Sequence, residues 1–403
     1  MRLVAASANR NSHQITTMFD IVHTPTDERV VLAGLMIPGQ NPLLFEEDME
    51  EMALLCRTAG AEVVETFVQK RERPVASTFL GSGKLREIRG RMREKQCRSL
   101  VIDAELSPGQ IRTIEKVTKG KVIDRSQLIL DIFAQHAKTK EARIQVELAQ
   151  LRTLYPRLTH AWTHFSQQVG GIGTRGPGEK QLEVDRRLVQ RKIADLNQKL
   201  RRIERSRATQ RKSREGAFRI TLVGYTNVGK SSLLNALSGS EVHVEDKLFA
   251  TLDTSTRKTW IEGTGSVVIS DTVGFIRKLP HHLVASFRST LEVVQGADLL
   301  LVVLDASSPW ADQRYQTIQE VLKSLEADKI PHLVVLNKSD TITDVFARKR
   351  MEIAFPDGLF VSAFNKDDMR KLREAIAEMV ADIKRERAMA DIVAQKTKTV
   401  LSG

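Results

Sequence analysis

Cysteine and long hydrophobic runs are both scarce in this sequence of 403 residues. Its two cysteines, Cys56 and Cys97, exclude a disulfide-rich scaffold and leave too few thiols for a zinc site built from cysteine. No apolar run approaches the ~18–20 residues that a helix needs to span a bilayer. After Met1, polar residues arrive before the apolar core of a signal peptide could form. These absences predict a chain without a membrane span in a reducing, cytoplasmic location.

The charge is distributed unevenly along the chain. Hydrophobic residues make up 41% and charged residues 28%, which argues against a disordered or fibrous protein. The formal net charge is +12. Residues 140–215 hold 18 basic and 8 acidic residues, a net charge of +10, whereas residues 217–385 hold 21 and 22, a net charge of −1. A concentrated basic segment indicates an anionic partner, although a solvated helix face would show the same composition.

The first part of the chain alternates short apolar runs with helical patterns. Residues 1–20 are expected to form a polar, poorly ordered lead. Residues 21–139 are expected to form a small α/β domain, because alternating strands and helices favour a mostly parallel sheet. Pro108 and Ser126 are the expected starts of two helices. The predicted strands are Arg29–Ile37, Ala61–Val68, Ser99–Ala104 and Lys121–Asp124, and the predicted helices are Leu43–Thr58, Lys84–Lys95, Pro108–Thr118 and Ser126–Ala137.

Residues 140–215 contain two sets of apolar residues that are spaced alternately four and three apart, as in a coiled-coil seam. The string Gly170–Gly178 between the two sets cannot be helical throughout, so we predict a basic helical hairpin with a glycine-rich tip. The alternative is two core helices joined by a loop, and arginines that face away from the seam favour a projecting hairpin. The seams are Ile144, Leu148, Leu151, Tyr155 and Leu158, then Val189, Ile193, Leu196, Leu200 and Ile203; the arginines are Arg201, Arg202, Arg205 and Arg207.

Two weaker patterns allow competing interpretations. Gly81–Lys84 reads G-S-G-K but lacks the full spacing of a phosphate-binding loop, so a turn before a helix is favoured over a second nucleotide site. Aromatic residues beside the glycine-rich tip could stack on unpaired RNA bases or pack at the base of the hairpin. These residues are Tyr155, Trp162 and Phe165, with His160 and His164 beside them.

A phosphate-binding loop follows the strand predicted at Phe218–Val223. The string Gly224–Ser231 reads G-x-x-x-x-G-K-S and leads into a helix that begins at Ser232, which is the context that this motif requires. In such a loop, backbone N–H groups and the helix N-terminus surround the phosphates. Lys230 is expected to contact the β- and γ-phosphates, and the Ser231 hydroxyl is expected to bind magnesium.

A second motif, D-x-x-G, occupies Asp271–Gly274 after the strand predicted at Ser266–Ser270. A strand-end Asp can hold the magnesium shell through water, and the Gly274 amide can sense the γ-phosphate. The pattern is common by itself, but its position after a phosphate-binding loop makes it informative.

A third motif, N-K-x-D, occupies Asn337–Asp340 after the strand predicted at His332–Leu336. The Asp340 carboxylate can accept from the ring N–H and the exocyclic amine of guanine, and adenine offers no such pair. Ser362–Phe364 ends the strand predicted at Leu359–Val361, where a backbone amide could meet the guanine carbonyl. The motifs together predict a three-layer α/β domain that binds GTP and GDP at its strand ends.

With these motifs in order, the chain resembles the HflX family of translation-associated GTPases. The resemblance rests on the string GGIGTRGPGEKQLE at Gly170–Glu183, on Phe249–Asp253 and on the three motifs above. It covers about residues 20–385 and implies an N-terminal α/β domain, a helical hairpin and a G domain. It also implies GTP hydrolysis to GDP and phosphate, binding to the large ribosomal subunit and its RNA, and splitting or rescue of stalled ribosomes. Some family members also use ATP, which the resemblance places at the N-terminal domain.

The resemblance assigns Thr251 as the switch residue that closes on magnesium when the γ-phosphate is present. The family often continues with Asp-Pro-Thr, whereas this chain has Asp253, Thr254 and Ser255, which would loosen the switch and leave Thr251 in place. Phe275 stands where many GTPases have a water-orienting glutamine. Catalysis must therefore use a backbone group, a partner or a bound cation.

Two further expectations follow from the resemblance. Asn227 is similar to the asparagine of potassium-dependent GTPases, which makes K⁺ a candidate cofactor beside Mg²⁺. The last helix of the G domain is expected at Lys371–Arg385, with a polar tail at 386–403. Some family members carry an extra small C-terminal domain that would contact the ribosome, and this chain is expected to lack it.

The sequence thus predicts an α/β protein with an N-terminal α/β domain at 21–139, a coiled-coil hairpin at 140–215 and a P-loop G domain with a mostly parallel sheet at 217–385. The residues leave open a regulatory GTPase that acts on a protein partner or at a membrane surface. The predicted Mg²⁺ ligands are Ser231 and Thr251, with Asp271 acting through water. The candidate ribosome and RNA contacts are Gly170, Gly171, Gly173, Arg175, Gly176 and Gly178. The predicted GTP-binding residues are Gly224, Tyr225, Thr226, Asn227, Val228, Gly229, Lys230, Ser231, Phe249, Ala250, Thr251, Leu252, Asp253, Asp271, Thr272, Val273, Gly274, Asn337, Lys338, Asp340, Ser362, Ala363 and Phe364.

Overall fold

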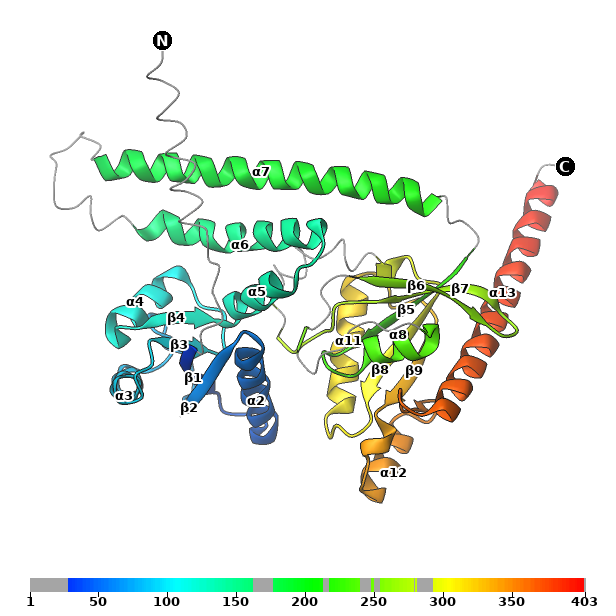
Figure 1. Ribbon diagram of the computed structural model, residues 1–403, viewed down its shortest axis with the longest axis horizontal. Helices are drawn as coiled ribbons and strands as arrows, with labels where there is room; N and C mark the ends of the chain where they lie inside the picture. The colour runs from blue at the N-terminus through cyan, green and yellow to red at the C-terminus, as the bar shows by residue number, and fades with distance from the viewer. Residues whose placement is uncertain are drawn as a thin grey trace, which may run out of the picture.

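The computed structural model describes residues 28–161, 177–212, 217–239, 248–249, 254–278, 280 and 293–401. Figure 1 shows two α/β domains side by side, with two long helices running along the first domain and reaching towards the second. No helix in the described part of the chain is both long enough and apolar enough to cross a membrane.

The N-terminal domain alternates four strands with four helices. The strands are β1 (Glu28–Met36), β2 (Ala61–Lys70), β3 (Ser99–Ile102) and β4 (Lys121–Asp124), and the helices are α2 (Pro42–Thr58), α3 (Ser82–Glu94), α4 (Pro108–Thr118) and α5 (Arg125–His136). The strands form a parallel sheet in the order β2-β1-β3-β4. Helices α2 and α5 cover the face that carries Val30 and Leu32, and α3 and α4 cover the face that carries Val31 and Ala33. The predicted parallel sheet is confirmed, and its central strands β1 and β3 are largely apolar because both of their faces are buried.

Two predicted helix starts lie within one residue of the observed ones. Pro108 is the first residue of α4, as predicted. Helix α5 begins at Arg125 rather than at Ser126, because the Asp124 side chain accepts a hydrogen bond from the Gln127 amide at 2.8 Å and so caps the helix. Asp124, at the end of β4, is therefore the N-cap of α5.

The structure agrees with the favoured interpretation of Gly81–Lys84 and describes the side chain of one residue of the aromatic pattern. Gly81 is the N-cap of α3, and Lys84 pairs with Glu87 at 2.7 Å within the first turns of that helix. Tyr155 packs against the hairpin seam, and its hydroxyl accepts a hydrogen bond from Gln190 Nε2 at 2.5 Å. The remaining aromatic and histidine side chains of that pattern lie outside the described residues.

The hairpin consists of α6 (Lys140–Ala161) and α7 (Pro177–Lys212). The predicted seams are confirmed as one apolar cluster, except for Leu158, whose side chain lies outside the described residues. Helix α6 is buried on two faces, because Ala142, Val146 and Ala149 also pack into the core of the N-terminal domain. Helix α7 is the outer helix, and its residues Arg201, Arg202 and Arg205 are exposed. The hairpin is therefore fastened along the N-terminal domain, with the basic helix facing solvent.

The G domain contains a six-stranded sheet in the order β10-β9-β8-β5-β7-β6, in which only β6 is antiparallel. The strands are β5 (Phe218–Gly224), β6 (Ser255–Ile261), β7 (Gly265–Asp271), β8 (Leu299–Asp305), β9 (His332–Asn337) and β10 (Leu359–Phe360). The helices are α8 (Lys230–Ser238), α11 (Ala311–Ser324), η1 (Ser339–Thr341), α12 (Val345–Ala354) and α13 (Lys366–Leu401). Helices α8 and α13 cover one face of the sheet, and α11 and α12 cover the other. The predicted mostly parallel sheet is confirmed.

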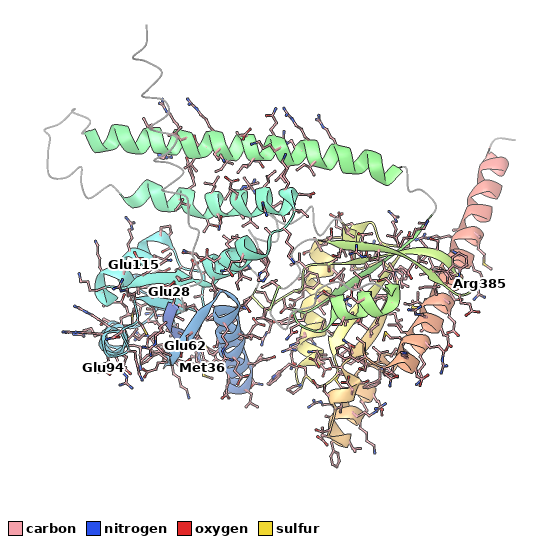
Figure 2. The ribbon with its side chains drawn as sticks, in the orientation of Figure 1. Glu28, Met36, Glu62, Glu94, Glu115 and Arg385 are labelled. Atoms are coloured by element: carbon pink, nitrogen blue, oxygen red, sulfur yellow. The ribbon has the colours of Figure 1, made fainter. Side chains whose placement is uncertain are left out.

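Helix α13 is much longer than predicted. Its buried side chains run from Met369 to Ile383, spaced three and four residues apart, and anchor it to the sheet. The prediction that the helix ends at Arg385 was wrong, and residues 386–401 are helical rather than an irregular tail. No glycine or proline occurs between Arg385 and Leu401, so no such residue stops the helix there. Figure 2 labels Arg385 on α13, with further turns of the helix beyond it.

Candidate functional site

The phosphate-binding loop lies between the end of β5 and the start of α8, as predicted. Gly229 and Asn227 have left-handed backbone, with φ of 90° and 62°. A Cβ at Gly224 would overlap the carbonyl oxygen of Val303, and a Cβ at Gly229 would overlap Nδ2 of Asn337. Both glycines are therefore required by close packing. The loop fits tightly against the neighbouring strands β8 and β9.

Lys230 is the first residue of α8 and is 6% exposed. Its Nζ donates to the carbonyl oxygens of Gly224 at 3.2 Å and Tyr225 at 2.7 Å. Burial lowers the pKa of Lys230 to about 8, and the nearby charge of Asp271 opposes this shift. The loop thus holds a poorly solvated cation, which a phosphate group would stabilise.

Asp271 is fully buried at the end of β7, and its Oδ2 accepts a hydrogen bond from Ser231 Oγ at 2.6 Å. No donor within the described part of the chain reaches its other oxygen, Oδ1. Burial raises the pKa of Asp271, and Lys230 and Ser231 oppose the shift. An unpaired carboxylate oxygen beside a hydroxyl is a suitable donor set for Mg²⁺, the cation that GTPases use. Ser231 would bind the ion directly and Asp271 would hold its shell; the third predicted residue, Thr251, lies outside the described residues.

The segment after Asp271 lies against the phosphate-binding loop. The Thr226 amide donates to the Phe275 carbonyl at 2.8 Å, and the Phe275 amide donates to the Gly224 carbonyl at 3.0 Å. A Cβ at Gly274 would lie 2.9 Å from Lys230 Nζ, so the Gly274 backbone is close to the atom that would hold the γ-phosphate. The side chain of Phe275 is 2% exposed and belongs to the apolar core. Phe275 anchors this segment and does not face the site.

Asn337 at the end of β9 connects two loops of the site. Its Nδ2 donates to the Val228 carbonyl at 2.8 Å, and its Oδ1 accepts from the Ala363 amide at 3.2 Å. Asp340 lies in η1 with an exposed side chain that forms no ion pair in the described part of the chain. Its carboxylate is available to accept from guanine. Asn337 therefore holds the two loops together, and Asp340 keeps an exposed carboxylate.

The neighbouring predicted residues contribute to the same loops. Lys338 has φ of 61° and pairs with Asp305, at the end of β8, at 2.8 Å. The Ser362 amide donates to Asp368 at 2.9 Å, which fixes the loop to the start of α13. Phe364 is 87% exposed. Sequence reasoning did not identify Asp305 or Asp368, because neither residue belongs to a motif.

A buried arginine joins the N-terminal domain to the site. Arg125, which follows β4, is 2% exposed and donates to Asp103 at 2.7 Å and to Glu51 at 2.5 Å. It also donates to the carbonyl of Arg277, three residues after Gly274, at 2.6 Å. The neighbouring hydroxyl of Tyr225, in the phosphate-binding loop, donates to Glu51 and accepts from the Arg277 amide.

Further ion pairs extend this contact between the domains. Lys278 pairs with Asp48 at 2.8 Å and with Asp103 at 3.2 Å. Arg314 on α11 pairs with Glu47 on α2 at 2.6 Å. Burial raises the pKa of Glu47, and the charge of Arg314 opposes the shift. Figure 2 shows side chains filling the space between α2 and the G domain.

The predicted switch string Phe249–Asp253 is described only at its first residue. The Phe249 ring packs edge-on against Phe133 of α5, with centroids 4.8 Å apart. Apolar contacts of this kind join the cores of the two domains into one cluster. The N-terminal domain therefore touches the phosphate-binding loop and the segments on both sides of the site.

Sequence reasoning missed this contact between the domains. A signal was present in the acidic run Glu46–Glu51 of α2, where Glu47 and Glu51 share a helix face four residues apart. The predicted ribosome contacts lie elsewhere. The tip residues Gly170–Gly176, including Arg175, lie outside the described residues, and Gly178 lies in the first turn of α7.

Comparison with known proteins matches three successive parts of the chain. Three family models match in order: GTP-binding GTPase N-terminal over residues 46–134, GTP-binding GTPase Middle Region over 136–214, and 50S ribosome-binding GTPase over 219–338. The chain also aligns with a crystal structure of SsGBP in complex with GDP, with 25% identity and a TM-score of 0.49, covering 88% of this chain and 99% of that chain.

The assignment to a family rests on relatives that align with most of this chain. GTPase HflX of Flavobacterium psychrophilum is 43% identical over 377 residues, which cover 88% of this chain and 91% of that protein. GTPase HflX of Escherichia coli is 42% identical over 338 residues, which cover 83% of this chain and 79% of that protein. Similarity of this extent, together with the phosphate, metal and guanine groups described above, shows that the chain belongs to the HflX family of GTPases.

Proposed function

We propose that this GTPase binds the large ribosomal subunit in the cytoplasm through ribosomal RNA, and that GTP binding and hydrolysis drive the splitting or rescue of stalled ribosomes. The observation that carries the proposal is the exposed basic surface of α7. The family model that matches residues 219–338 is described as a 50S ribosome-binding GTPase, which supports the same partner.

The basic surface of α7 suits a polyanion. Its exposed arginines form two groups along the outer helix of the hairpin, and α6 holds that helix against the N-terminal domain. Arginine is the side chain best suited to phosphate groups, because its planar fork donates two parallel hydrogen bonds. The exposed arginines are Arg187, Arg191, Arg201, Arg202 and Arg205.

The nucleotide site supplies the switch. The phosphate-binding loop and Lys230 would hold the phosphates, and Asp340 would accept from guanine. Ser231 and Asp271 would hold Mg²⁺, which would supply positive charge to the phosphates. We propose that the γ-phosphate orders Thr251 and Gly274 and that hydrolysis releases them.

Catalysis in this proposal does not use the residue after Gly274. Phe275 is buried and cannot orient a water molecule, so a backbone group, the ribosome or a bound cation must do so. We propose K⁺ as that cation, with Asn227 beside it. GTPase rates that are equal in potassium and sodium buffers would exclude this part of the proposal.

A salt titration of binding to purified large subunits tests the proposed contact between α7 and ribosomal RNA. Because each phosphate contact releases counterions, log affinity should fall steeply and linearly with log salt. Arg201→Glu/Arg202→Glu should weaken binding and flatten that slope, whereas Lys366→Glu/Arg370→Glu, the same charge change on exposed α13 residues, should leave both unchanged. A shallow slope, or equal binding by the two variants, would favour a protein partner or a membrane surface.

A further inference from the structure

Helix α12 exposes most of its apolar side chains. Phe346 is 82% exposed, Ile353 is 83% exposed and Val345 is 68% exposed. Met351 is the only buried residue in this helix of ten residues. A surface helix normally turns its apolar side chains towards the core, so α12 is reversed in this respect. Single exposed apolar residues need no explanation, but three within nine consecutive positions form a patch.

The exposed side chains form a stripe with a defined chemical pattern. Phe346 and Ile353 are seven residues apart, which places them on one helix face about 10 Å apart along the axis. Lys349 and Arg350 lie between them, three and four residues after Phe346 on the same face, and both are exposed. Neither forms an ion pair within the described part of the chain. The stripe therefore presents two cations between two apolar side chains.

The remaining contacts hold α12 with this stripe outwards. The Asp344 side chain caps the helix by accepting from the Phe346 amide at 2.9 Å. Arg348 stacks on the Phe360 ring, 4.9 Å from its centroid, and donates to Glu352 at 3.2 Å. In Figure 1, α12 lies at the end of the G domain away from the α6–α7 hairpin. The stripe thus consists of residues that belong neither to the nucleotide motifs, nor to the basic face of α7, nor to the contact between the domains.

The pattern selects one class of partner. RNA phosphates would pair with Lys349 and Arg350 but would gain nothing from the aliphatic side chain of Ile353. A lipid surface would have to take in the two cations together with the apolar residues, because the cations interrupt the stripe and do not flank it. An acidic protein surface can place carboxylates opposite the cations and apolar side chains on both sides of them.

We propose that α12 is a docking helix for an acidic protein partner, with Phe346 and Ile353 as apolar anchors and Lys349 and Arg350 paired with the partner's carboxylates. The apolar anchors occupy the first and eighth positions of this face and the cations the fourth and fifth, so the partner's surface must place carboxylates between two apolar pockets. The inference does not depend on the proposed ribosomal function, because α12 belongs to neither surface used there.

Photocrosslinking in the full-length protein tests the proposal. A photoreactive phenylalanine analogue replaces Phe346 in the cells that make the protein, and the same analogue replaces the exposed Arg370 on α13 as the matched control. The expected result is a crosslink to an acidic protein at position 346 and none at the control position. The proposal is overturned if position 346 crosslinks to RNA or lipid, or to nothing beyond what the control position captures.

Binding measurements with the purified crosslinked protein complete the test. Phe346→Ser/Ile353→Ser and Lys349→Glu/Arg350→Glu should each weaken affinity at least tenfold, and affinity should fall with rising salt. Both double variants should retain the melting temperature and GTP affinity of the wild type, because the changed side chains are exposed. Affinity that stays unchanged in both variants would also overturn the proposal.

Discussion

The two α/β domains share an architecture but use the ends of their strands differently. In both domains, parallel strands lie between helical layers, and polar residues gather at the carboxyl ends of the strands. In the G domain these residues include Asp271 and Asn337, which line the nucleotide site. In the N-terminal domain they include Asp103 and Arg125, which meet the G domain beside that site. The fold places polar groups at an edge, and the identity of the side chains decides what that edge does.

The difference lies in what the charged groups are paired with. Asp271 Oδ1 has no donor within the described part of the chain, and Lys230 bonds only to backbone carbonyls among those residues. By contrast, both terminal nitrogens of Arg125 are used, by Asp103, by Glu51 and by a backbone carbonyl. At the contact between the domains the charged side chains form ion pairs with one another, although Arg125 Nε has no hydrogen-bond partner within the described residues. At the nucleotide site, Lys230 and Asp271 Oδ1 have no such side-chain partner there, which suits a charged ligand.

The largest expected effect is a loss of stability when Arg125 is replaced in the contact between the domains. Arg125→Met should destabilise the protein by about 3–5 kcal/mol, because it leaves the buried carboxylates of Asp103 and Glu51 without their cation. Urea unfolding of the two proteins measures this difference. Arg370→Met, at an exposed position of α13, is the control and should change stability by no more than about 0.5 kcal/mol. An equal effect of both substitutions would contradict the structural role of Arg125.

Lys230→Ala should show the opposite behaviour. It should weaken GTP binding by roughly 100-fold or more, because the charged contacts to the phosphates are lost, each worth about 1.5–3 kcal/mol. Stability should not fall, since burial already disfavours the charged form of Lys230. Titration with a fluorescent GTP analogue, together with thermal melting, separates the two effects. Retained affinity would remove Lys230 from the phosphate site.

Asp340→Asn should change which base the site prefers. The carboxylate can accept from two donors of guanine, whereas an amide offers one acceptor and one donor, which suits xanthine. GTP affinity should fall about 10- to 100-fold, and XTP affinity should rise relative to it. The two nucleotides are titrated side by side against wild type and variant. An unchanged preference would show that Asp340 does not face the base.

The smallest expected effect is on pH dependence. The pKa of Lys230 is lowered from 10.5 to about 8, so the free site loses its positive charge as the pH rises through 8. Bound phosphates stabilise the charged form, and GTP affinity should therefore fall by up to about tenfold between pH 8 and pH 9. The stability of the fold has the opposite pH dependence and rises with pH. The unfolded chain keeps this proton up to pH 10.5, so Lys230 destabilises the fold below pH 8 and this cost disappears towards pH 10.5.

A GTP titration across this pH range, in the presence of excess Mg²⁺, measures how steeply GTP affinity falls with pH. The Asp340→Asn variant with XTP is a suitable control, because it changes the base contact and keeps Lys230. It should show the same slope. A flat profile in both proteins would indicate that the lysine keeps its charge in the free site.

The G domain was predictable from sequence because its chemistry lies in short, ordered motifs at the ends of apolar strands. The positions of Gly224, Asp271 and Asn337 follow from those motifs alone. The hairpin seams were predictable from their spacing, because apolar periodicity reports which face a helix buries. The length of α13 was not predicted, although no glycine or proline separates Arg385 from Leu401 and Met389, Ile392 and Val393 keep helical spacing.

The contact between the domains could not be predicted in the same way. Arg125 and Arg277 are 152 residues apart in the sequence and meet only because two separately folded domains pack together. The acidic run of α2 gives no indication of which cations it will meet. Asn337 was predicted as part of a guanine motif, and its role in joining the two loops of the site depends on hydrogen bonds that no motif records.

The central claim is that the nucleotide held at the G-domain edge controls binding to the large ribosomal subunit. Co-sedimentation of the full-length protein with purified large subunits, in the presence of a non-hydrolysable GTP analogue, GDP or no nucleotide, tests it most directly. The account predicts stable co-sedimentation with the GTP analogue and weak co-sedimentation in the other two states, a difference that Lys230→Ala should abolish. Equal binding in all three states, or no binding in any, would contradict it.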